Sequence, residues 1–369
     1  MSHLRKNATA LAAAAALATM ANSALAQRVD FSGYGTLAAT DNTSDLGDYR
    51  ANWRQSAGAN NGIDVGVDSR LGAQANVTFN DTFSAAAQAL AIRRDGDKFK
   101  LNAEWLYGQA QVTSELSVRA GRLVLPTFML SDVRNVGYAQ HWVRTPAEVY
   151  LGFPVTSIDG AQVLYRTDVG GVRLTVQPTY GQAKATVFFD GGMLGELQGG
   201  AKWDDLWSLN VSAEKGDWTF RAGETTSKSS LVYENAPFIP TSRFTDKFTS
   251  LGAQYDNGAL LVMAEFVDRE TSSKEFDTRA WYSSAGYRIG SWMPYVSVAR
   301  LTNLGTTVKS NPASRTIAGG LRWDVVKNVD LKLQIESSTL SGQQFVKLQP
   351  TADKSKNVNI VTLASDFVF

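Results

Sequence analysis

The chain of 369 residues contains no cysteine, so a disulfide scaffold, a thiolate metal site and a cysteine nucleophile are excluded. It has 36 basic and 35 acidic residues, which give a formal net charge of +1, and like charges do not gather in blocks. This balance argues against a nucleic-acid partner, which would require a basic stripe or tail, and against a polybasic membrane-surface binder.

The first 26 residues have the three parts of a secretory signal peptide. Arg5 and Lys6 form a basic start, an Ala- and Leu-rich apolar stretch follows, and the small-residue sequence ALA at 24–26 ends the segment. We therefore predict a signal peptide over 1–26 and a mature barrel domain over 27–369, with a retained membrane anchor as the alternative. Without the segment, 34 basic and 35 acidic residues remain, so the formal net charge becomes −1. No later apolar stretch reaches about 18 residues, the length of a membrane-spanning helix.

Period-2 alternation of apolar and polar residues begins after this segment and continues to the end of the chain, as in strands with one apolar and one wet face. In the segment 70–79, Leu71 and Val77 fall on one parity while Arg70 and Gln74 fall on the other. The alternation predicts about sixteen strands, near 29–39, 70–79, 83–92, 100–112, 115–122, 158–167, 171–180, 203–214, 217–227, 245–256, 259–268, 277–289, 291–301, 314–325, 329–339 and 357–369.

The connections between these strands alternate between short and long. Short ones, which suit tight hairpins, fall at 168–170, 215–216, 256–258, 290 and 326–328. Long polar ones fall at 40–69, 181–202, 228–244 and 340–356. All tight ends then lie on one side, which a sandwich or a propeller does not need but an outer-membrane barrel does. The pattern predicts an all-β protein: a transmembrane antiparallel β-barrel with short periplasmic turns and long extracellular loops.

The last twelve residues, VNIVTLASDFVF, form a strand whose apolar parity includes Phe367 and Phe369. In a closed barrel the last strand pairs with the first, and we predict that these two residues close the barrel on its lipid-facing side. The same outward face is expected to carry an interfacial girdle of aromatic residues, to which we assign Trp105, Tyr107, Trp207, Trp218, Trp281 and Trp323.

A signal peptide, an opening strand containing FSGYG and a final strand that ends in Phe resemble the general Gram-negative porin family, the 16-stranded β-barrel porins. The strongest local match is RAGRLVLPTFMLSDVRNVGYAQHWVRTPAEVY followed by SIDGAQVLYR. The resemblance implies that the third long loop, residues 123–157, folds into the pore and narrows it. It also implies that the barrel-assembly machinery reads the terminal Phe, and it includes assembly as a homotrimer. The second long loop, RRDGDKF, is shorter than the latch that porin trimers use.

Charged residues of the infolded loop and of the wet parity are the candidate pore residues. Those of the pore constriction are Asp132, Arg134, His141, Arg144 and Glu148. Those of the pore wall are Arg70, Lys100, Glu104, Arg119 and Arg173. The wet parity also includes Arg322, Lys332 and Glu336. It carries more basic than acidic residues, so we expect a weak anion preference, with Arg119 as the dominant wall residue.

Catalysis is not favoured by the sequence. His141 is the single histidine outside the signal peptide, and Ser131-Asp132 nearby is the best triad-like grouping. The Gly-rich stretch 191–200 lacks the Lys-Ser/Thr of a phosphate-binding loop and is interpreted as a mobile loop.

We expect no cofactor and no metal. The predicted function is a passive water-filled channel for small hydrophilic solutes and ions in the bacterial outer membrane, surrounded by outer-membrane lipid. A substrate-specific channel or surface receptor of the same architecture is the alternative, and a barrel enzyme is less favoured.

Overall fold

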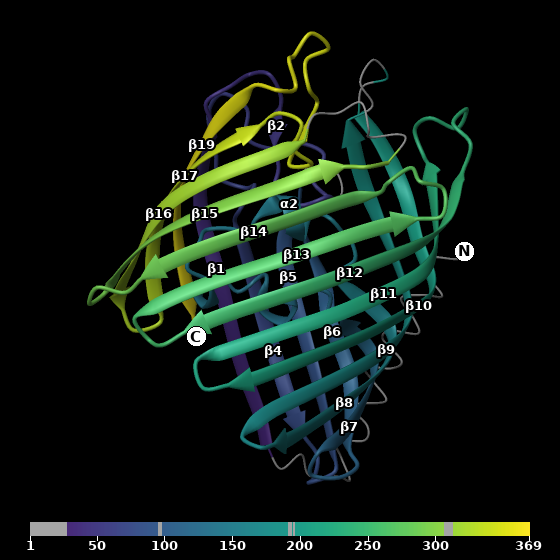
Figure 1. Cartoon of the computed structure of the whole chain (residues 1–369), viewed down its shortest axis with the longest axis vertical. Helices are drawn as coiled ribbons and strands as arrows, with labels where there is room; N and C mark the ends of the chain where they lie inside the picture. Colours follow the sequence, from purple (N-terminus) through teal and green to yellow (C-terminus); the bar gives the residue numbers. More distant parts are fainter. Residues whose placement is uncertain (1–27, 95–97, 191–193, 195, 306–312) are drawn as a thin grey trace.

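The computed structural model describes residues 28–94, 98–190, 194, 196–305 and 313–369, so the predicted signal peptide lies outside them. One antiparallel sheet of seventeen strands closes on itself; β3 has two residues, and the other sixteen strands form the barrel (Figure 1). These sixteen are β1 (Arg28–Asn42), β4 (Arg70–Thr78), β5 (Phe83–Arg94), β6 (Lys98–Gln111), β7 (Leu116–Val124), β8 (Ser157–Val169), β9 (Val172–Asp190), β10 (Glu196–Lys215), β11 (Trp218–Tyr233), β12 (Ser242–Asp256), β13 (Leu260–Thr271), β14 (Thr278–Tyr287), β15 (Trp292–Asn303), β16 (Ser314–Val326), β17 (Val329–Thr339) and β19 (Asn357–Val368). The predicted barrel is confirmed.

The remaining elements belong to the connections. Two short strands, β2 (Asp48–Tyr49) and β18 (Phe345–Val346), pair with each other beside the barrel, and β3 (Ile63–Asp64) extends the sheet next to β1. The connection after β7 contains the 3₁₀ turns η1 (Ser131–Val133) and η2 (Gly137–Ala139) and the one-turn helix α2 (Ala147–Tyr150). Within the described ranges, no helix has the length and apolar character needed to cross a membrane.

The barrel closes where β1 pairs with β19, with Gly35 opposite Phe367. Gly33 and Phe369 exchange two backbone hydrogen bonds, of 2.8 and 3.0 Å. The rings of Phe369 and Phe367 occupy the space that a Cβ would fill at Gly33 and Gly35. The two glycines are therefore needed because each lets an aromatic ring lie across the seam. Phe367 and Phe369, which the sequence analysis assigned to barrel closure, lie at this seam.

Side chains alternate between the two faces of the barrel. On β19, Leu363 points outward and is 59% exposed, while its neighbours Thr362 and Ala364 point inward and are buried. On β4, the outward Leu71 is 50% exposed. An exposed apolar belt around a barrel whose polar residues point inward is the arrangement that lipid stabilises.

Strand β6 departs from the predicted alternation. Gln88 of β5 lies opposite Trp105 but Ala89 lies opposite Ala103, so Glu104 is an extra residue in a β-bulge. The bulge moves the following residues to the other face. Trp105 and Tyr107 therefore point into the barrel, and their assignment to the outward girdle is wrong; Trp105 lines an interior hollow. The other four aromatic residues face outward, and Trp323 stacks on Trp292 at 4.9 Å.

Two of the long loops predicted from the sequence, 181–202 and 228–244, are mostly strand. Strands β9 and β10 contain 19 and 20 residues and pair up to Asp190 and Glu196. A 19-residue strand is about 60 Å long and, tilted by about 45°, rises about 45 Å, well above an apolar band about 25 Å tall. The outward faces of the upper parts meet water and carry polar residues such as Lys184, while Val187 and Trp203 are buried on the inward face. The apolar outward parity of the other strands is therefore missing, which is why these parts resembled loops. The Gly-rich stretch 191–200 was also misinterpreted, because 196–200 belong to β10; 191–193 and 195 lie outside the described residues.

Candidate functional site

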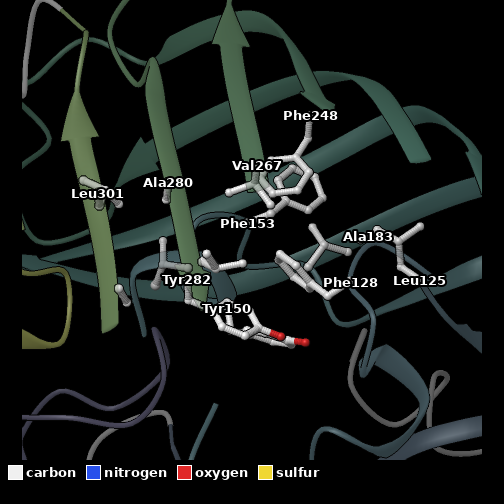
Figure 2. Close-up of a cluster of buried hydrophobic side chains, with 14 of the residues drawn as sticks. Leu125, Phe128, Tyr150, Phe153, Ala183, Phe248, Val267, Ala280, Tyr282 and Leu301 are labelled. Atoms are coloured by element: carbon white, nitrogen blue, oxygen red, sulfur yellow. The ribbon is translucent and has the colours of Figure 1, made fainter. Parts of the chain in front are cut away.

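The connection between β7 and β8, residues 125–156, folds into the barrel and is called the inner loop below. Its apolar side chains pack against the inward face of the wall (Figure 2). Phe128 stacks on Tyr150 at 4.7 Å, and Phe248 of β12 meets Phe128 at 5.5 Å and Phe153 at 5.2 Å. Burial of these aromatic rings removes a large apolar area from water, so the inner loop is held in place by a hydrophobic core inside the barrel.

Arg144 anchors the inner loop to the wall near the seam. Its guanidinium forms a bidentate pair with Asp68, at 2.6 and 2.9 Å, and a third bond of 2.9 Å to Glu336 of β17. It also donates to the hydroxyl of Thr362 at 2.5 Å and lies 5.0 Å from the ring centre of Tyr49. Burial alone would lower the pKa of Arg144, but the neighbouring carboxylates raise it well above its usual value. The anchor therefore stays charged at every physiological pH.

Two further cations of the wall hold backbone carbonyls of the inner loop. Lys332 of β17 donates to the carbonyl of Gly137 at 2.8 Å and pairs with Asp366 at 2.8 Å. Arg322 of β16 donates to the carbonyls of Tyr138 and Gln140, both at 2.8 Å. These contacts fasten the middle of the inner loop along β16, β17 and β19.

The start of the inner loop is fixed on the opposite part of the wall. Arg221 of β11 donates to the carbonyls of Pro126 at 3.1 Å and Met129 at 3.3 Å. The backbone N–H of Met129 donates to the carboxyl of Glu265 on β13. The inner loop is thus bound to one half of the wall, from β11 through β17 and β19 to β1.

His141 and Glu148 are buried polar residues with hydroxyl partners. His141 Nε2 lies 2.8 Å from the hydroxyl of Ser284, and burial, together with the charges of Lys332 and Arg322, lowers the pKa of His141 to about 3. The imidazole is therefore neutral. Glu148 accepts hydrogen bonds from Ser314 at 3.0 Å and Thr316 at 2.6 Å, and burial raises the pKa of its carboxyl.

Asp132 and Arg134 lie where the inner loop meets β5 and β6. They line a hollow of about 10 Å³ together with Glu104 and Trp105. The side chain of Asp132 is exposed, whereas Arg134 donates to the carbonyl of Tyr150 at 3.3 Å, and burial lowers the pKa of Arg134. Asp132 is the residue of this pair that faces open lumen.

The five predicted constriction residues do not meet in one ring. Arg144 and Glu148 line a space of about 20 Å³ on the seam side, Asp132 and Arg134 line the hollow near β6, and His141 lines a space of about 270 Å³ near the turn end of the barrel. They lie apart because the inner loop runs along different parts of the wall, with Arg144 bound to Glu336 of β17 and His141 bound to Ser284 of β14.

All five predicted wall residues point into the barrel. Glu104 pairs with Arg94 at 2.9 Å, and Arg173 lies 3.5 Å from Glu214. The other three form no ion pair among the described residues. They are Arg70, whose Nε and Nη2 are buried without hydrogen bonds, Lys100, which is exposed, and Arg119, which donates to Gln109 at 2.7 Å and lies 5.1 Å from the ring centre of Tyr107.

Sequence reasoning placed Lys332, Arg322 and Glu336 on the inward face but missed that they hold the inner loop. Asp68 was missed altogether, because it precedes β4 in a polar connection where no alternation marks its direction. Within the described residues, no cluster of His, Asp and Glu has the make-up of a metal site.

These features define a bacterial outer-membrane channel: a sixteen-stranded barrel with an apolar belt, a polar interior and one loop folded inside it. The family model described as Gram-negative porin matches residues 8–343, so the chain belongs to the Gram-negative porin family. A comparison with curated proteins gives no match by sequence.

Solved structures of low sequence identity share the fold. OmpT of Vibrio cholerae superposes with a TM-score of 0.60 and 15% identity, covering 92% of this chain and 97% of that one. The anion-selective porin from Comamonas acidovorans gives 0.58 and 14%, covering 93% and 99%. Salmonella typhi OmpF, solved with daunomycin, gives 0.58 and 12%, covering 93% and 98%. The fold of the whole barrel is therefore shared, although at most 15% of the residues are identical in these three comparisons.

Proposed function

We propose that this porin is a passive channel for small hydrophilic solutes and ions, with a weak preference for anions. The observation that carries this proposal is the charge of the inward wall away from the inner loop. Lys100, Arg119 and Arg166 point inward there and form no ion pair among the described residues. The inward acids Glu104 and Glu214 are paired with arginines.

A positive wall attracts anions only weakly in a wet pore, since charges are screened within about 10 Å at 0.1 M salt. Exposed Asp132 on the inner loop offsets part of the field. The preference should therefore be small and should fade at high salt. The resemblance to an anion-selective porin agrees with this direction.

Arg119→Gln tests the proposal in planar bilayers, by reversal potentials in a salt gradient. We expect the anion preference to fall. Arg122→Gln is the matched control, because Arg122 lies three residues further along β7 on the outward face, where it pairs with Asp159 at 2.7 Å. A cation preference in the native protein, or equal shifts in the two variants, would show that the assignment of the wall is wrong.

We also propose a homotrimer, which the trimer form of Vibrio cholerae OmpT supports. The middle of the outward face of β4 and β5 consists of alanines, with Ala73 opposite Ala89 and Ala75 opposite Ala87. A hollow of about 900 Å³ lies beside them on the outside of the seam. Small residues let neighbouring backbones approach closely within a membrane. Ala89→Trp should give monomers in mild detergent by light scattering, whereas Ala161→Trp on outward β8 should not.

Finally, we infer that the channel catalyses no reaction. His141 bonds to Ser284 rather than to Ser131, and among the described residues no carboxylate binds its other ring nitrogen. Ser131 instead accepts the backbone N–H of Phe128 at 2.8 Å. A buried neutral imidazole without an orienting acid is a poor general base.

Phe369 is proposed as the mark that the barrel-assembly machinery reads. It is exposed on the outward face at the turn end, next to Phe367 at a ring distance of 6.4 Å.

A further inference from the structure

A hollow of about 260 Å³ lies at the loop end of the barrel, above the inner loop. Strands β9 to β15 form one side of it, the connections that contain β2 and β18 form the other, and Pro154 of the inner loop contributes to it. A solute that enters from the loop end therefore meets this hollow before it reaches the inner loop.

The lining of this hollow is strongly aromatic. Trp53 and Phe189 lie 5.6 Å apart, and Phe244 and Phe276 lie 5.1 Å apart. Together with Tyr233 they are half-buried and line the hollow. A channel for hydrophilic solutes has no need of aromatic surface at its entrance, and leaving such rings in water is unfavourable. Concave apolar surface with a few polar groups is instead typical of a small-molecule site.

The charged groups of the lining have one sign. Arg50, Arg269 and Lys354 line the hollow, and none of the described lining residues is acidic. Arg269 also pairs at 2.7 Å with Asp246 of β12, which does not line the hollow. The guanidinium of Arg50 lies 4.6 Å from the ring centre of Trp53, and that of Arg269 lies 5.7 Å from that of Phe276. Cation and aromatic ring are thus combined on both sides of the hollow.

Two polar atoms of the lining residues have no partner among the described residues. They are the indole Nε1–H of Trp203 and the amide Oε1 of Gln343, both buried. A buried donor without a partner is costly, by about 1–3 kcal/mol. An occupant with an acceptor oxygen would satisfy the indole donor.

We propose that this hollow binds a small aromatic carboxylate with a single ring, and that the channel takes up this class of solute selectively. The aromatic rings recognise the ring of the solute, and the basic lining favours its carboxylate. This inference rests on the proposed channel function and names a substrate class for it. Capture at the mouth raises the local concentration of the solute above the inner loop, so its flux exceeds that of acetate at low concentration and saturates at high concentration.

Isothermal titration calorimetry of the purified protein in detergent tests the site, with sodium benzoate as the probe. We expect benzoate to bind saturably, sodium acetate to give no binding, and neutral benzyl alcohol to bind at least several-fold more weakly. Phe276→Ala should weaken benzoate binding at least tenfold. Phe238→Ala is the matched control, because Phe238 is exposed in the 234–241 connection and does not line the hollow.

Heat-modifiable migration on a gel verifies that each variant is folded, and Phe244→Leu replaces Phe276→Ala if that variant is not. Absence of benzoate binding, or equal affinities in the Phe276 and Phe238 variants, would overturn the proposal. Equal binding of benzyl alcohol would overturn its carboxylate part. Chloride conductance in planar bilayers separates the two claims: a protein that conducts but does not bind benzoate refutes only the site, and one that binds benzoate but does not conduct refutes only the channel.

Discussion

Replacement of Arg144 by Met should release the inner loop. The guanidinium pairs with Asp68 and Glu336, whose side chains are 1% and 7% exposed, so its removal leaves two buried carboxylates without a cation. Breaking a buried ion pair by removing one partner costs about 3–5 kcal/mol. At about 1.4 kcal/mol for each factor of ten, the equilibrium for opening of the loop should shift by roughly a hundred- to several-thousand-fold.

The absence of cysteine in the native chain gives a direct assay. Val143→Cys places a thiol at a fully buried position of the inner loop, where a thiol reagent reacts only when the loop opens. We expect Arg144→Met to increase the labelling rate in this background by at least a hundredfold. Arg28→Met is the control, because the exposed pair of Arg28 and Asp30 is worth about 1 kcal/mol or less. An increase below about tenfold would refute the view that this network holds the loop.

Deletion of Phe369 should leave the exported protein protease-sensitive and without heat-modifiable migration, because two backbone hydrogen bonds to Gly33 and a ring across the seam are lost; normal migration would contradict the closure argument. Burial raises the pKa of Glu148, so its ionised form destabilises the seated loop at neutral pH, and this penalty disappears as the pH falls through the raised pKa. In the Val143→Cys background, the labelling rate of the introduced thiol, divided by that of a free thiol at the same pH, should therefore be lower at mildly acidic pH, and Glu148→Gln should abolish the dependence of this ratio on pH. His141→Ala should leave conductance nearly unchanged between pH 5 and 8, since the pKa of about 3 keeps the ring neutral there; lost conductance would assign His141 a role in permeation.

The barrel could be predicted from sequence because each strand carries its own signal. Period-2 alternation gives the orientation of residues such as Leu71 and Arg70 without knowledge of any partner. The prediction failed where this signal is interrupted. One extra residue at Glu104 reverses the faces of Trp105 and Tyr107, and no local feature of the sequence marks the bulge.

The prediction for the upper parts of β9 and β10 failed for a different reason. Their outward faces meet water above the membrane, so charged residues such as Lys184 and Lys202 occupy outward positions and lie opposite each other, while Val187 and Trp203 are buried on the inward face. The apolar outward parity that marks the other strands is therefore missing there, and glycines such as Gly199 and Gly200 weaken what remains of the pattern. Strand length in a barrel can therefore be underestimated wherever a strand leaves the bilayer.

The arrangement of the inner loop could not be predicted from the sequence because the residues that it contacts are distant along the chain. Arg144 meets Asp68 and Glu336, which lie 76 and 192 residues away. Alternation indicated that Glu336 points inward but not what it contacts, and the balanced charges of the loop concealed that Arg144 and Glu148 are bound to separate groups of the wall.

Inner loop and wall therefore form one electrostatic unit, which limits how either can change. Transfer of this loop into another barrel would bury Arg144 without Asp68 and Glu336. The unpaired buried cation would then destabilise the seated loop, just as two unpaired buried carboxylates destabilise it in Arg144→Met. Replacing Arg144, Asp68 and Glu336 together by Met, Asn and Gln should cost less than Arg144→Met alone, because no buried charge is then left without a partner. If the thiol introduced by Val143→Cys is labelled as fast in the triple variant as in Arg144→Met, the loop is held by its apolar packing and not by this network.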